Sequence, residues 1–130
     1  MRHIEYVDEL EQVLKKAQKI IITAHAFPDI DAIGSCLALA HYLGQNNEVK
    51  VWIPKIKLEH WQFLPLENYI CMDLPTDFLF DTCIVCDCST LERIEKYDQL
   101  KNCKHSYDLI NIDHHPDNNF FGDINIVEKI

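Results

Sequence analysis

The chain has 130 residues, which is enough for one domain with a substantial core but few for a two-domain enzyme. Its 12 Lys and Arg residues against 21 Asp and Glu residues give a formal net charge of −9. This charge argues against a general binder of nucleic acid or of membrane surfaces, because such anionic partners would be repelled. A phosphate substrate handled through bound cations remains compatible, since those cations need clustered carboxylates.

The composition also bears on where the protein works. No apolar run approaches the roughly 20 residues of a membrane span, and the chain starts without the apolar segment of a signal peptide. The cysteines sit mostly within apolar strand or helix patterns, at Cys36, Cys71, Cys83, Cys86, Cys88 and Cys103. We therefore expect a reduced cytoplasmic protein with no disulfide framework and no membrane partner.

Helical and strand patterns alternate in the first half of the chain. Apolar residues at helical spacing over residues 4–17 predict an amphipathic helix that covers one face of a sheet. The apolar run Ile20–Ala24 predicts a strand buried on both faces, and Asp31 is expected to cap a helix over Ala32–Leu43. A second strand is expected over residues 48–53. Strand, helix and strand form a βαβ unit, which predicts a parallel sheet with a right-handed crossover.

The second half of the chain continues this design. Short apolar runs are expected to form further strands or strand-like stretches over residues 69–72, 82–87, 108–113 and 124–127. Ser89 or Thr90 is expected to cap a helix with Glu92 in its first turn. The fold class is therefore α/β, with three layers in which helices flank a mostly parallel sheet. The chain stops at Ile130 without a cap or a polar tail, so we expect the domain to be incomplete at its C-terminal end.

The spacing Cys83-x-x-Cys86-x-Cys88 is open to a zinc or redox interpretation. Residues 83 and 86 of one strand point to opposite faces, and no second cysteine pair completes a site. We therefore favour ordinary packing of these thiols.

Three separate strands are followed by acidic or imidazole side chains. These are His25, Asp29 and Asp31 after the first, Asp87 after the second, and Asp113, His114 and His115 at the third. In an open parallel sheet they would gather at the carboxyl edge, where ligands bind. Crowded carboxylates repel one another unless cations neutralise them, and mixed imidazole and carboxylate ligands favour manganese, zinc or iron over calcium. Since there are more ligands than one ion needs, the pattern indicates two metal ions.

These residues also carry a resemblance. His25-x-x-Pro-Asp29-x-Asp31-Ala-x-Gly-Ser, then Val-Cys-Asp87, then Asn-Ile-Asp113-His114-His115 resemble the first three motifs of the DHH phosphoesterase family. The residues around these motifs are most similar to those of the nano-RNase (oligoribonuclease) and pAp-phosphatase branch of that family. The resemblance runs from about residue 18 to the end of the chain, and it implies that residues 1–130 are an N-terminal DHH catalytic domain.

The resemblance implies a role for each motif residue. His25 and Asp29 would hold one manganese ion, Asp31 and His114 would hold the other, and Asp87 would bridge the two. Asp113 would support the site, and His115 would lie toward the substrate phosphate, so Asp87, Asp113 and His115 are the expected catalytic residues. Relatives add a fourth motif with a further aspartate ligand and a basic, glycine-rich substrate-binding domain, and neither is in this chain.

We therefore expect a phosphoesterase domain that uses two divalent cations, most simply manganese. By the resemblance, its substrates would be short oligonucleotides and 3′-phosphoadenosine 5′-phosphate (pAp). The alternatives are a pyrophosphatase, a cyclic-dinucleotide phosphodiesterase, a RecJ-type exonuclease, or a non-catalytic domain that binds metal or nucleotide. By itself the chain is expected to fold, to turn over little substrate, and to be capable of forming a homo-oligomer.

Overall fold

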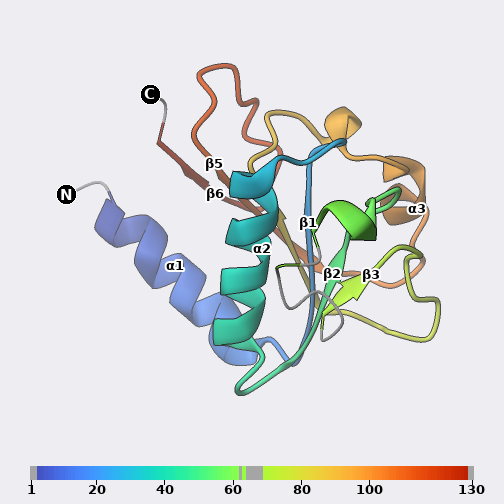
Figure 1. The fold of residues 1–130 in the computed structure, drawn as a ribbon. Coiled ribbons are helices and arrows are strands. Elements are labelled where there is room, and N and C mark those ends of the chain that lie inside the picture. The colour runs from blue at the N-terminus through green and yellow to red at the C-terminus, as the bar shows by residue number, and fades with distance from the viewer. Residues whose placement is uncertain (1–2, 62, 64–68, 129–130) are drawn as a thin grey trace.

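The computed structural model describes residues 3–61, 63 and 69–128. Within these ranges, six parallel strands form one sheet in the order β3-β2-β1-β4-β5-β6 (Figure 1). The strands are β1 (Lys19–Ala24), β2 (Glu48–Trp52), β3 (Ile70–Cys71), β4 (Thr82–Cys86), β5 (Asp108–Asp113) and β6 (Ile124–Val127). The predicted fold class and the parallel sheet are thereby confirmed.

The two central strands of the sheet are β1 and β4. From β1 the chain proceeds outward to β2 and β3, and from β4 it proceeds in the other direction to β5 and β6. The loops that leave the carboxyl ends of β1 and β4 therefore diverge, and this is the position where open parallel sheets bind ligands. Both strands are covered on both faces, which explains why their sequences are mainly apolar and do not alternate with charged residues.

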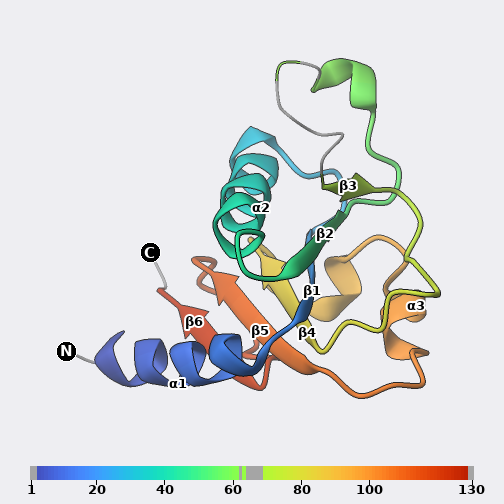
Figure 2. The ribbon, with the colours of Figure 1, turned by 90° about the horizontal axis from the view of Figure 1, so that it is seen from below.

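Helices cover the two faces of the sheet unequally. The helices α1 (His3–Lys16) and α2 (Ile30–Leu43) lie on one face, and the short helix α3 (Tyr97–Lys101) lies on the other (Figures 1 and 2). Alternate residues of β1 divide between two cores: Ile20 and Ile22 pack toward α1 and α2, whereas Ile21 packs with Trp52 and Leu100. The result is the expected three-layer arrangement. None of the helices in the described ranges is long and apolar enough to cross a membrane.

The start of α2 differs from the sequence prediction. The N-cap is Asp29, not Asp31: its backbone is extended, and its side chain accepts a hydrogen bond from the Ala32 backbone N–H. Asp31 lies instead in the first helical turn, where a carboxylate also interacts favourably with the helix dipole. Pro28 is compatible with this earlier start because it precedes the cap and interrupts no helical hydrogen bond.

The segment after β4 also differs from the prediction of one capped helix. Thr90 occupies an N-cap position but makes no side-chain cap bond, and only a three-residue 3-10 turn, Leu91–Arg93, follows it. The next helix is α3, which begins after Lys96, a residue in the left-handed region with φ of 59°. That conformation cannot continue a right-handed helix, so the segment is divided in two.

The cysteines of β4 behave as packing residues. Cys83 belongs to the core on the α3 face and Cys86 to the core on the α2 face, as the alternation of side chains along a strand predicts. Burial raises the pKa of the Cys83 thiol far above its ordinary value and that of Cys88 to about 12. These two thiols therefore stay protonated and weakly nucleophilic near neutral pH.

Candidate metal centre at the carboxyl edge of the sheet

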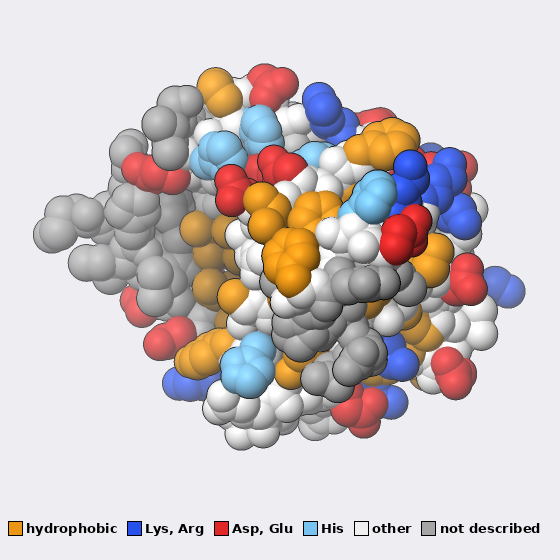
Figure 3. Space-filling view, in the orientation of Figure 1, with side chains coloured by type: hydrophobic (Ala, Val, Ile, Leu, Met, Phe, Trp, Pro, Cys, Tyr) orange, Lys and Arg blue, Asp and Glu red, His pale blue; other side chains and the backbone are white. Residues whose placement is uncertain are grey.

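The predicted acidic and imidazole residues meet at the carboxyl edge. His25 directly follows β1, Asp87 directly follows β4, and Asp113 is the last residue of β5 with His114 next to it. The register aligns Ala24 with Cys86 and Cys86 with Ile112, so the three strands end level with one another. In Figure 3, histidine and acidic side chains gather at the upper edge of the molecule, where β1 ends.

Asp87 lies at the centre of this cluster. One carboxylate oxygen is 3.3 Å from His25 Nε2, and the other is 3.0 Å from His114 Nε2. Its backbone has a positive φ of 56°, which aspartate tolerates better than most residues, and its N–H donates to the Ile112 carbonyl at 2.9 Å. Each oxygen therefore lies close to a different histidine, an arrangement that is compatible with a carboxylate shared between two cations.

A backbone carbonyl of the next residue determines which nitrogen of the neutral His25 ring carries the hydrogen. Its Nδ1 lies 2.7 Å from the Ala26 carbonyl oxygen, which can only accept, so Nδ1 carries the hydrogen. In the neutral ring, Nε2 then presents a lone pair to the Asp87 carboxylate at 3.3 Å. Two facing lone pairs repel unless a proton or a cation lies between them. An imidazole fixed in this way is a typical metal ligand.

Two groups of side chains have the composition and spacing of metal ligands. In each group, every residue offers a ligand atom within 4.8 Å of the others, and the groups are His25, Asp29 and Asp87, and Asp87, Asp113, His114 and His115. Both contain Asp87. Mixed imidazole and carboxylate donors fit the expected divalent cations of the manganese or zinc type. Neither group includes Asp31, which is exposed in the first turn of α2, so its assignment as a ligand stays a prediction.

His115 is held by a buried carboxylate. The Asp113 side chain is 0% exposed, and one of its oxygens accepts a hydrogen bond from His115 Nδ1 at 2.6 Å. This bond is the main reason that the pKa of His115 is raised. Burial by itself would raise the pKa of Asp113, but hydrogen bonds from Asn118 and His115 outweigh it, so the pKa of Asp113 is lowered. The pair therefore favours a protonated imidazole beside an ionised carboxylate.

Asn118 is a residue of this edge to which the sequence pattern assigned no role. It is buried, and its Nδ2 group donates to Asp113 at 2.8 Å and to the Cys88 carbonyl at 3.2 Å. Its Oδ1 accepts from Asn111 Nδ2 at 2.9 Å and from the Phe120 backbone N–H at 2.8 Å. Asn118 thus ties the loop after β5 to the carboxylate that holds His115. In the sequence it stands beside another asparagine in a polar loop, and although it belongs to the residues that resemble the nano-RNase and pAp-phosphatase branch, spacing assigns it no role.

Replacing Asn118 by alanine should lower the free energy of unfolding by about 1–3 kcal/mol, because buried partners on Asp113 and Asn111 lose their hydrogen bonds. Urea denaturation followed by circular dichroism measures this change. The exposed neighbour Asn119 provides the matched control, and Asn119→Ala should stay within about 0.5 kcal/mol of the parent. Equal effects of the two substitutions would contradict the structural role given to Asn118.

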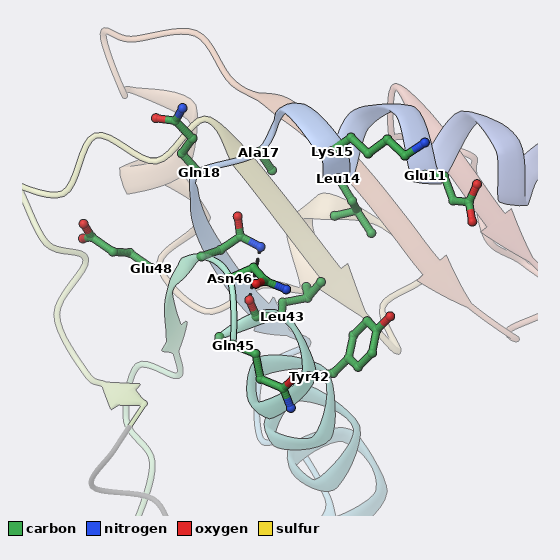
Figure 4. A pocket seen from close by; sticks show the side chains of 12 residues that line it. Glu11, Leu14, Lys15, Ala17, Gln18, Tyr42, Leu43, Gln45, Asn46 and Glu48 are labelled. Atoms are coloured by element: carbon green, nitrogen blue, oxygen red, sulfur yellow. Dashed lines mark hydrogen bonds between the residues drawn. The ribbon is translucent and has the colours of Figure 1, made fainter.

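Two hollows on the surface of the molecule lie away from the candidate site. One of about 1120 Å³ lies between the C-terminal ends of α1 and α2, at the amino edge of the sheet, and Tyr42, Leu14 and Glu48 are among its lining residues (Figure 4). Another of about 1000 Å³ lies beside α3. Neither is lined by residues of the two ligand groups. The candidate site is therefore identified by its chemistry and not by its volume.

Comparisons with known proteins bear on the class of this domain. The model of the DHH family, N-terminal domain, matches residues 19–129. The crystal structure of an exopolyphosphatase-related protein from Bacteroides fragilis is similar to this chain, with a TM-score of 0.81 and 29% sequence identity. The alignment covers 95% of this chain and 38% of that one, so this chain spans little more than a third of that protein. A comparison with curated proteins gave no match. The chain belongs to the DHH family.

Proposed function

We propose that this domain hydrolyses phosphodiester or phosphomonoester bonds of short oligonucleotides and of pAp, with two divalent cations, most simply manganese. The observation that carries the proposal is the position of Asp87, whose two oxygens face His25 on one side and His114 on the other. Membership of the DHH family supports the hydrolytic class. The choice of substrate and of manganese rests on the resemblance of the three motifs, and of the residues around them, to the nano-RNase and pAp-phosphatase branch.

We assign the ligands as follows. His25 and Asp29 would hold one cation, His114 and Asp31 the other, and Asp87 would contact both. Bound cations would supply Lewis acidity, stabilise charge on the phosphoryl oxygens and lower the pKa of water. Asp29 is suited to its part because capping of α2 fixes its side chain at the start of a helix, where the backbone also favours anions.

His115 would supply a proton. The hydrogen bond from its Nδ1 to Asp113 orients the ring and favours its charged form, which leaves Nε2–H as a donor. We propose that this group donates to an oxygen of the scissile phosphate or to the leaving oxygen, as a general acid. Asp113 acts through His115, since its side chain is fully buried and its oxygens are already bonded to His115 and Asn118.

The acidic composition is consistent with an anionic substrate only if cations mediate binding. At a net charge of −9, the chain would repel a phosphate that approached without them. We propose that a further domain, as in the relatives that the motifs resemble, holds the bases and closes over the phosphate. Without it, we expect substrate binding by this chain to be weak.

Titration with Mn²⁺ in a calorimeter tests the cation assignment. We expect about two Mn²⁺ ions per chain, tighter binding of Mn²⁺ than of Ca²⁺, and loss of both on adding a chelator. Assays against a dinucleotide and pAp should then give little or no turnover. Turnover in the ordinary range of about 1–10³ per second would show that further parts are dispensable. No Mn²⁺ binding at all would contradict the two-cation assignment.

A second candidate is hydrolysis of phosphoanhydride bonds, as in pyrophosphate. The observation that favours it is the similarity to the protein from B. fragilis described as exopolyphosphatase-related. The same cluster would serve, because both reactions need charge neutralised on phosphoryl oxygens. Parallel assays with pyrophosphate and with a dinucleotide separate the two candidates, since the slow turnover expected of this chain should be confined to one bond type.

A further inference from the structure

Phe27 is exposed at an unusual place. It is 85% exposed, more than any other large hydrophobic residue whose side chain the structure describes. Its backbone has a positive φ of 53°, a conformation that is uncommon for an aromatic residue. It stands two residues after His25 and two before Asp29, both members of one ligand group. An exposed apolar ring on a strained backbone is a combination that folding alone does not favour, and such strain is concentrated at functional sites.

The loop holds Phe27 in place from both sides. On one side, the Ala26 N–H donates to the Arg93 carbonyl at 2.6 Å, and the Ala26 carbonyl accepts from His25 at 2.7 Å. On the other side, Asp29 caps α2 and its carbonyl accepts from the Ile33 N–H at 3.0 Å. The backbone that presents the ring is therefore held by hydrogen bonds on both sides, between the candidate ligands His25 and Asp29.

The surroundings suit a ligand that is anionic at one end and flat at the other. In Figure 3, hydrophobic side chains lie directly beside the acidic and histidine side chains at this edge of the molecule. A nucleotide has this character, since its phosphate is joined through a ribose to an aromatic base. Bases stack on aromatic side chains, and such stacking discriminates little between bases because every base has a π face.

We propose that Phe27 is a stacking surface for the base of a nucleotide whose phosphate is held at the Asp87 cluster. The inference rests on the proposed function and adds to it a contact made by this chain itself. Base recognition would then begin on the loop between β1 and α2, only two residues from the side chains assigned to the first cation.

The test compares adenosine 5′-monophosphate with ribose 5-phosphate, which carries the same phosphate without a base. Calorimetric affinities are measured in saturating Mn²⁺ for the parent chain, Phe27→Ala and Phe27→Tyr. Phe27→Ala should weaken binding of the nucleotide by about 5- to 140-fold and leave ribose 5-phosphate within about twofold. Phe27→Tyr keeps the ring and should stay close to the parent. The matched control is Tyr42→Ala, which removes a 71% exposed aromatic at the opposite edge of the sheet (Figure 4).

The other outcomes are decisive as well. Unchanged binding of the nucleotide in Phe27→Ala would overturn the inference. An equal loss for both ligands would also overturn it, because the ring would then shape the phosphate site or a contact with another domain. If the parent chain binds both ligands with the same affinity, the base makes no contact here, and the inference fails while the proposed function stands. If the parent binds neither ligand, base recognition by this chain is overturned, and the proposed function is judged separately by the Mn²⁺ titration.

Discussion

Asp87→Asn should reduce hydrolysis to background and abolish tight binding of both Mn²⁺ ions. Asp87 is common to the two ligand groups, and its oxygens lie 3.3 Å from His25 Nε2 and 3.0 Å from His114 Nε2. Loss of one charged ligand therefore affects both cation positions at once. Asparagine is chosen because it keeps the volume of the side chain and tolerates the positive φ of this position, where alanine would add backbone strain.

Hydrolysis is assayed in saturating Mn²⁺, and cation binding is measured by calorimetry. The control is Asp98→Asn, which removes an exposed carboxylate from α3 on the far face of the sheet and should change neither quantity. Circular dichroism spectra should be superimposable for the three proteins. Parent-like activity of Asp87→Asn, or tight binding of two Mn²⁺ ions by it, would contradict the hypothesis that two catalytic cations share Asp87.

Much of the sheet could be predicted from the sequence. The runs that became β1 and β4 are short and mainly apolar, with threonine as the polar residue at buried positions, because both strands are buried on both faces. Each is also followed by a polar residue, His25 or Asp87, which marks the point where the chain leaves the sheet. A buried central parallel strand can thus be predicted from the local sequence alone, as a short apolar run followed by a polar residue.

The helix boundaries were less predictable, because local preferences competed. Asp29 and Asp31 both have side chains suited to capping, and the choice between them depends on which one has an extended backbone in the folded chain. Likewise, Thr90 follows the capping rule but makes no cap bond. The backbone at Lys96 is left-handed, and a lysine gives no sign of this conformation in the sequence.

In the candidate site, too, one part could be predicted from the sequence and another could not. His25, Asp87 and His114 were placed together correctly because strand order and direction decide where strand ends meet. The bonds beneath them, from Asn118 to Asp113 and from His25 to its neighbouring carbonyl, depend on side-chain geometry that no spacing reveals. Sequence reasoning therefore found the residues that meet at this edge and missed Asn118, which holds Asp113 in position.

His115→Gln should lower turnover by about 10²- to 10⁴-fold while leaving the number and affinity of bound Mn²⁺ ions close to the parent. Glutamine can still donate to Asp113 but cannot supply a proton to the leaving oxygen.

The pH profile provides the sharper measurement. The hydrogen bond to Asp113 raises the pKa of His115, so the charged ring persists above its ordinary range around 6.5. Turnover of the parent should fall as the pH rises through this raised pKa, because the acid form is lost. In His115→Gln that basic limb should be missing, and the remaining slow rate should follow only the other groups. Loss of Mn²⁺ in this variant would instead assign His115 as a ligand, consistent with its place in one ligand group. An unchanged basic limb would show that the proton comes from elsewhere.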